Sequence, residues 1–149
     1  MREERIYLDY AATTPVDRRV LEEMLPYFDT FFGNPSSVHV FGQKAEAAIE
    51  NAREIIASKM GVSAREIVFT GCGTESDNLA LRGVALARRE KFGADRILIT
   101  PVEHHAVSHT AEQLAEHFGF RLEFLKVDSR GVVDADDLRK KLARDVAIV

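Results

Sequence analysis

The strongest constraint on the fold is a regular alternation of short apolar runs and amphipathic stretches along residues 66–149. Short apolar runs bounded by turn residues are typical of buried strands, and apolar residues at three- and four-residue spacing are typical of helices. Strands that alternate with helices form a mostly parallel sheet covered by those helices. We therefore predict an α/β fold with strands over residues 66–70, 96–100, 121–127 and 146–149, and helices over residues 75–91, 105–118 and 134–143.

The first 65 residues have a different organisation. Residues 6–15 predict an extended arm that ends in a Thr-Pro pair, because the residue before proline is disfavoured in a helix. A helix is expected from about Asp17, with a kink or a stop at Pro26. The turn-rich residues 33–37 precede a second, longer helix over residues 42–60, which Gly61 should end.

Composition excludes several classes of protein. The net charge of -4 offers no clustered basic face for nucleic acid or an anionic membrane. No apolar run approaches the roughly 18 residues of a bilayer span, and the start of the chain lacks the apolar core of a secretory signal. The single cysteine, Cys72, cannot form an internal disulfide framework. We expect a cytoplasmic protein. The apolar residues 146–149 indicate that a buried strand begins where the sequence stops, so we also expect a fragment.

Residues 70–78, TGCGTESDN, form the most informative turn. Here a predicted strand runs into Gly71 and Gly73 before a helix opens, and free N–H groups at a helix start favour an anion such as phosphate. The turn matches neither the P-loop nor the GxGxxG pattern. Two alternatives stay open: a plain turn capped by Thr74, and a Cys72 that is either a reactive thiol or a small buried residue.

Three histidines follow the second predicted strand in PVEHHAVSH. His105 and His109 have the i, i+4 spacing of two zinc ligands, with Glu103 nearby, but no third ligand is evident and we predict no metal site. His104 precedes the helix at a strand end, where ligands of open α/β sheets bind. Its imidazole can pack on a flat ring or exchange protons near neutral pH. The alternative is a histidine that caps the helix.

The chain resembles a known family through four motifs. IYLDYAATTPVD, FGNPSSVHVFG, REIVFTGCGTESDNLA and PVEHHAV are similar, in order and spacing, to the amino-terminal part of the pyridoxal-phosphate-dependent cysteine desulfurases. These enzymes belong to the class V aminotransferase superfamily and have the type I, aspartate aminotransferase-like fold. The resemblance implies an arm at residues 1–15, which joins the small domain, and an incomplete first half of the large cofactor domain at residues 16–149.

The resemblance also implies a cofactor and site residues. Pyridoxal 5'-phosphate would bind with its phosphate at Gly73 and Thr74 and its ring against His104, which would move protons. Asn34 and the Ala11 to Thr14 arm would approach the substrate entrance. The lysine that holds the cofactor and the cysteine that carries sulfur would follow Val149, and Cys72 would not take that role.

The expected activity of the complete protein is conversion of L-cysteine to L-alanine. The persulfide sulfur would pass to an acceptor, such as a scaffold protein for iron-sulfur cluster assembly or a thiolation pathway. The resemblance implies a homodimer with an active site at the subunit interface. Two alternatives are another class V aminotransferase or a selenocysteine lyase, and a non-catalytic chain that binds a partner chain. By itself, the 149-residue chain is expected to be inactive.

Overall fold

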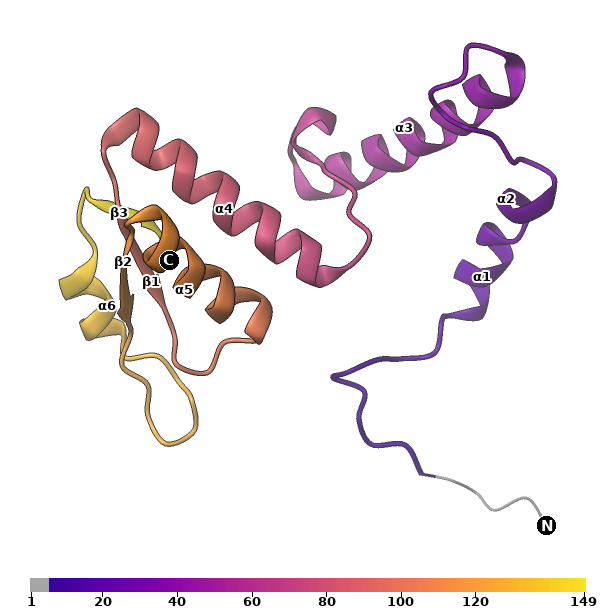
Figure 1. Cartoon of the computed structure of the whole chain (residues 1–149). Helices are drawn as coiled ribbons and strands as arrows, with labels where there is room; N and C mark the ends of the chain where they lie inside the picture. The colour runs from indigo at the N-terminus through magenta and orange to yellow at the C-terminus, as the bar shows by residue number, and fades with distance from the viewer. Residues whose placement is uncertain (1–5) are drawn as a thin grey trace. The chain divides into compact units, whose positions relative to one another are not determined.

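The computed structural model describes residues 6–149, which divide into two compact units at Val68 and Phe69. The first unit contains three α-helices and a short 3-10 turn, and the second contains a sheet with three α-helices (Figure 1). None of the helices in the described part of the chain is both long and apolar enough to cross a membrane.

The first unit begins with an irregular segment and two short helices, and a turn in which the Ala12 N–H donates to the Asp9 carbonyl at 3.1 Å interrupts the predicted extended arm. Helix α1 (Arg18–Met24) starts at Asp17, whose carboxylate accepts a hydrogen bond from the Arg19 N–H at 2.9 Å. It stops before Pro26, which opens α2 (Pro26–Asp29), so the predicted break at Pro26 is confirmed. Proline fits this first helical position because its missing N–H would have no helical acceptor there.

Helix α3 (Val40–Met60) is the longest helix of the chain's described part and agrees closely with the predicted 42–60 helix. The preceding loop is packed tightly against its start: a Cβ on Gly42 would lie 2.1 Å from the Ser37 carbonyl oxygen. Most of the apolar side chains on α3 are exposed, and only Gly42 and Ala57 are buried among residues 6–68. The structure therefore gives this unit little core of its own.

The second unit is built on a parallel sheet of three strands in the order β2-β1-β3. Strand β1 (Arg96–Ile99) lies in the centre, with β2 (Arg121–Phe124) and β3 (Val146–Ile148) on its two sides. Helices α4 (Gly73–Phe92), α5 (His105–Phe118) and α6 (Ala135–Lys141) precede the three strands or connect them. The predicted α/β class is confirmed.

The two faces of the sheet bury different helices because neighbouring residues of β1 point to opposite sides. Ile97 and Ile99 pack with α4 and α5, and Leu98 packs with Val146 and Leu125 on the face that α6 covers (Figure 1). Helices α4 and α5 end at Gly93 and Gly119, whose left-handed backbone (φ of 69° and 70°) an L side chain rarely adopts.

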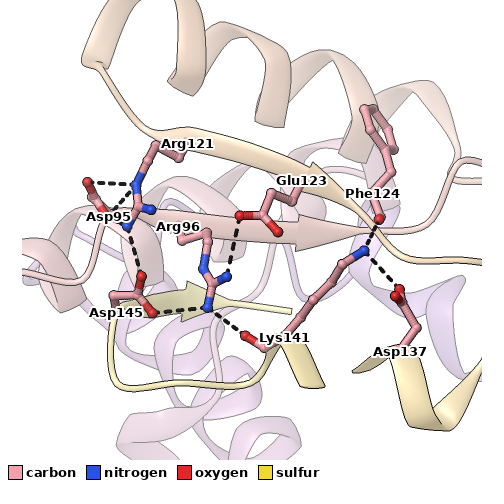
Figure 2. Close-up of polar contacts among 8 residues, drawn as sticks. All are labelled: Asp95, Arg96, Arg121, Glu123, Phe124, Asp137, Lys141 and Asp145. Carbon is pink, nitrogen blue, oxygen red and sulfur yellow. Dashed lines mark hydrogen bonds and ion pairs between the residues drawn. The ribbon is translucent and has the colours of Figure 1, made fainter. Parts of the chain in front are cut away.

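Charged side chains join the amino ends of the strands. Arg121 donates to Asp95 at 2.6 Å and to Asp145 at 2.8 Å, and Arg96 donates to Asp145 and to the Lys141 carbonyl (Figure 2). The hydrogen bonds from Arg121 hold the pKa of the Asp95 and Asp145 carboxyl groups below the usual range. Beyond β2, Lys141 of α6 donates to Asp137 and to the Phe124 carbonyl (Figure 2).

The predicted strand over residues 66–70 is wrong. Glu66 ends the 3-10 turn η1 (Ala64–Glu66), where its carboxylate accepts from the Ser63 N–H, and residues 67–70 form no strand. A strand is held by backbone hydrogen bonds to a neighbouring strand, and within residues 6–149 the three strands of the sheet pair only with one another. The side chain of Arg53 instead donates to the Ile67 carbonyl.

The third predicted strand, residues 121–127, is too long. Strand β2 ends at Phe124 because its partner β1 ends at Ile99, which is paired with Phe124. Val127 forms only an isolated antiparallel bridge with Val133. An apolar run therefore gives the position of a strand but not its length, which the partner strand decides.

Candidate functional site

The start of α4 presents unused hydrogen-bond donors. Its first residue, Gly73, follows Cys72, whose side chain makes no capping bond. The Gly71 N–H is taken by the Glu75 carboxylate at 2.6 Å, and the Ser76 N–H by the Cys72 carbonyl. The N–H groups of Gly73, Thr74 and Glu75 and the Thr74 hydroxyl make no hydrogen bond within residues 6–149. These four donors lie at the positive end of a 20-residue helix.

Thr74 is thus not the cap of α4, and that alternative from the sequence is wrong. The helix starts one residue earlier because Gly73 itself adopts helical backbone geometry, which leaves Thr74 at the second helical position. There its hydroxyl is not used for capping. A Cβ on Gly73 would meet no atom within 4 Å, so the approach to these donors is open.

His104 caps α5, as one alternative from the sequence predicted. Its Nδ1 accepts a hydrogen bond from the Ala106 N–H at 3.1 Å. Because Nδ1 uses its lone pair in this bond, a neutral His104 carries its proton on Nε2. The cap therefore defines both the tautomer and the direction of the ring. A second proton can bind Nδ1 only after the bond to Ala106 opens.

Thr74 and His104 line the same hollow. It measures about 420 Å³ and lies along the amino-terminal halves of α4 and α5, where Arg82, His105 and Gln113 also contribute to its wall. The sequence places Thr74 and His104 thirty residues apart, and the structure brings them together. Donors for a phosphate on one helix start and an imidazole on the other fit the two parts of pyridoxal 5'-phosphate, a phosphate group and a flat ring.

Glu75 limits how this site can attract an anion. Its carboxylate lies at the same turn, so it adds a negative charge close to the free N–H groups. A phosphate at this turn would rely on directed hydrogen bonds from the backbone and Thr74 and on the helix dipole, while Arg82 adds a positive charge in the wall of the hollow.

The other two histidines of the motif also line the hollow. The rings of His105 and His109 stack with centroids 4.7 Å apart, one turn from each other on α5. Glu103 accepts from the Thr100 hydroxyl at 2.7 Å. Within residues 6–149, no group of three or more histidine, cysteine, aspartate or glutamate side chains is arranged around a common metal position.

Asn34 and Cys72 belong to different units. Asn34 lies in the first unit, where its side-chain oxygen accepts from the Ser36 N–H at 2.9 Å and shapes the loop before α3. Its role at the substrate entrance stays a prediction. Cys72 is exposed, so the alternative that it is a small buried residue is wrong.

Two polar residues of the site escaped the sequence analysis. Asn78 donates to the carbonyls of Thr74 and Ala106, and Thr110 donates to Asn78 at 2.7 Å. Asn78 is four residues after Thr74 and Thr110 six after His104, so each lies near a predicted site residue along its own helix. That spacing could have indicated that both residues lie near the site. It could not have indicated that they contact each other, because they are 32 residues apart in the sequence.

Comparison with known proteins shows what the whole chain is similar to. The model of the family described as aminotransferase class-V matches residues 6–149. The chain is 48% identical to the cysteine desulfurase IscS of Dictyoglomus turgidum over 144 residues, which are 97% of this chain and 36% of that protein. It is 44% identical to the mitosomal cysteine desulfurase of Encephalitozoon cuniculi over 146 residues, with 97% and 34% covered. The chain thus spans about a third of the length of these curated relatives.

Solved structures show the same similarity. A structure described as a NifS-like protein superposes with a TM-score of 0.86 at 45% identity, and the match covers 95% of this chain and 38% of that one. A second, described as SspA in complex with cysteine, has a TM-score of 0.81 at 38% identity and covers 94% of this chain and 40% of that one. The two units are therefore similar to the corresponding part of longer proteins.

Proposed function

Because the chain belongs to the class-V aminotransferase family, we propose that the complete protein is a pyridoxal-phosphate-dependent cysteine desulfurase, to which residues 1–149 contribute part of the cofactor site. The proposed reaction converts L-cysteine to L-alanine and passes the sulfur, as a persulfide, to an acceptor. The relatives named cysteine desulfurase support this substrate, as does the related SspA structure described as in complex with cysteine.

The observation that carries the proposal is the shared hollow of Thr74 and His104. The N–H group and hydroxyl of Thr74, which lines the hollow, and the N–H group of the preceding Gly73 would bind the phosphate of the cofactor. The imidazole of His104 would lie against the cofactor ring. When bound, pyridoxal phosphate supplies an electron sink for the reacting amino acid.

The capped form of His104 defines what this side chain can contribute. With Nδ1 bonded to Ala106, the ring holds its proton at Nε2 and presents it as a hydrogen-bond donor. In this form neither ring nitrogen has a free lone pair, so proton transfer by His104 would require the bond from the Ala106 N–H to Nδ1 to open first. The cap at the start of α5 thus determines which nitrogen carries the proton.

The remaining assignments extend the same proposal. The sulfur acceptor is a scaffold protein for iron-sulfur cluster assembly or a thiolation partner, the active form is a cytoplasmic homodimer, and the cysteine that carries sulfur is not Cys72. We also retain the proposed division into a small-domain arm at residues 1–15 and a large cofactor domain that begins at residue 16.

The test uses the complete protein as its gene encodes it, purified with pyridoxal phosphate. We expect equimolar alanine and sulfide from L-cysteine in the presence of a thiol reductant, with cofactor absorbance that is retained on gel filtration. Production of a keto acid from an amino donor in place of sulfide, or activity with selenocysteine alone, would overturn the choice of substrate.

Thr74 offers a matched pair of variants for the cofactor site. Thr74→Ser keeps the hydroxyl and should keep cofactor affinity within about threefold, since only a methyl group is lost. Thr74→Val keeps the shape but removes the donor, and the loss of one charge-assisted hydrogen bond of about 1.5–3 kcal/mol predicts an affinity about 10- to 100-fold weaker. Equal affinities for the two variants would contradict the assigned contact with the phosphate.

A further inference from the structure

The carboxamide of Asn78 connects the first turns of α4 and α5. Its Nδ2 donates to the carbonyl oxygen of Thr74 at 2.9 Å and to that of Ala106 at 3.3 Å. Its Oδ1 accepts from the Thr110 hydroxyl at 2.7 Å. All four residues belong to the second unit and line the same hollow as His104.

The orientation of this carboxamide is fixed by its partners. Both amide hydrogens point at carbonyl oxygens, which only accept, and the oxygen faces a hydroxyl that can donate. The reversed orientation would place Oδ1 against two carbonyl oxygens. Thr110 is only 3% exposed, so water cannot readily replace its hydroxyl as the donor.

The contacts form a continuous link between the two predicted ligand residues. Asn78 donates to the carbonyl of Ala106, and the N–H of the same residue donates to His104 Nδ1. In an α-helix that carbonyl also accepts from the N–H four residues later, which here is Thr110. Asn78, Thr110 and Ala106 therefore close a ring of hydrogen bonds, and Thr74 is attached to it through its own carbonyl.

We infer that Asn78 and Thr110 are a positioning pair that holds the phosphate-binding turn at Thr74 and the capped imidazole of His104 at a fixed separation. The meaning of this separation for catalysis rests on the proposed function, but the link between Asn78 and the His104 tautomer does not. Without the pair, the Ala106 carbonyl loses its hydrogen bond from α4, and the Ala106 peptide is held less firmly. Its N–H should then break its bond to His104 Nδ1 more often.

The first test is ¹⁵N NMR of the histidine rings in the complete protein after removal of the cofactor. The His104 signals are assigned by their loss in His104→Gln. We expect the wild-type ring as the Nε2–H tautomer alone, and both tautomers in exchange in Asn78→Ala and in Thr110→Val. Thr110→Ser keeps the hydroxyl and should restore the single tautomer. A single Nε2–H tautomer in Asn78→Ala and Thr110→Val would overturn the inference.

A second measurement covers variants that fold poorly. Valine is nearly the same size as threonine, and serine is smaller by one methyl group, so neither variant should cause a clash. If Asn78→Ala does not fold, Thr110→Val and Thr110→Ser are compared with each other at temperatures at which both are folded. The pair should differ about tenfold in the affinity for pyridoxal phosphate and much less for pyridoxal, which lacks the phosphate. Equal ratios of the two affinities in both variants would contradict the inferred link to the phosphate turn.

The two proposals fail in different ways. A wild-type protein with a single His104 tautomer that is lost in Thr110→Val, but with no alanine or sulfide from L-cysteine, would refute the function and retain the positioning pair. Full desulfurase activity with a tautomer that is insensitive to Asn78 and Thr110 would do the reverse.

Discussion

Replacing His104 can separate its role as a helix cap from its chemistry. Asparagine is among the best N-cap residues, because its side-chain oxygen accepts from the N–H two or three residues later. His104→Asn should thus keep the bond from the Ala106 N–H that Nδ1 now accepts at 3.1 Å, while it removes the imidazole. His104→Ala removes both.

The expected difference between the variants follows from this one bond. Loss of an N-cap side chain costs about 0.5–2 kcal/mol, and the exposed position of His104 places the value near 1 kcal/mol. Since RT is about 0.6 kcal/mol, opening of the first turn of α5 should become about fivefold more frequent in His104→Ala. The rate of alanine formation should fall about 10²- to 10⁴-fold in both variants, as for the loss of a general acid or base.

Amide hydrogen exchange of residues 106–109 in the complete protein measures the first effect, and alanine formation from L-cysteine measures the second. Equal exchange rates in His104→Ala and wild type would refute the cap. Wild-type turnover in His104→Asn would refute the assigned proton transfer, whatever the exchange data show.

Two further predictions concern stability. Gly42→Ala should lower the free energy of unfolding by about 1–3 kcal/mol, because its Cβ would lie 2.1 Å from the Ser37 carbonyl oxygen. The control Gly83→Ala, in open space on α4, should be neutral or stabilising. Urea denaturation of both variants measures the difference, and an unchanged stability of Gly42→Ala would contradict the tight packing of the loop. Hydrogen bonds from Arg121 lower the pKa of Asp95 and Asp145 in the folded protein, so their contribution to stability is complete above the unfolded pKa of about 3.9. It decreases below that pH and is lost as the pH falls through the lower pKa of the folded state. The urea midpoint should therefore depend less on pH between 5 and 3 in Arg121→Gln than in wild type or in the exposed control Arg18→Gln, and three parallel curves would argue against the network.

Local signals in the sequence predicted the helices well and the edges of the sheet poorly. The predicted stop at Gly61 and break at Pro26 are properties of single residues, and both are confirmed. Helix α5 also ends at Phe118, where the apolar spacing predicts. Residues 67–70 have a strand-like composition, but the strand fails because its existence depends on a partner. Val68 is accordingly 65% exposed.

The candidate site was predictable in its parts but not in its assembly. Glycines in the turn before a helix indicated an anion site at residues 70–78, and the strand-end position drew attention to His104. The family resemblance then implied Gly73 and Thr74 as the residues that bind the phosphate. Neither pattern contains the distance between α4 and α5, which the packing of Leu81, Ala85, Ala111 and Leu114 against the sheet determines. The link through Asn78 and Thr110 depends on that packing, and so it was missed.

The ionic cluster of Arg121, Asp95 and Asp145 has a consequence for how this fold can vary. Its ion pairs link the strands at their amino ends, whereas helices α4 and α5 begin near the opposite, carboxyl ends of the strands. An insertion in the loop at residues 100–103 would change the edge of the hollow next to His104 and leave the ion pairs intact. An insertion at residues 93–95 would displace Asp95 and break the ion pair that links β1 to β2. Differences in ligand specificity between related proteins should therefore arise from the loops at the carboxyl ends of the strands, while the loops at the amino ends keep a nearly constant length.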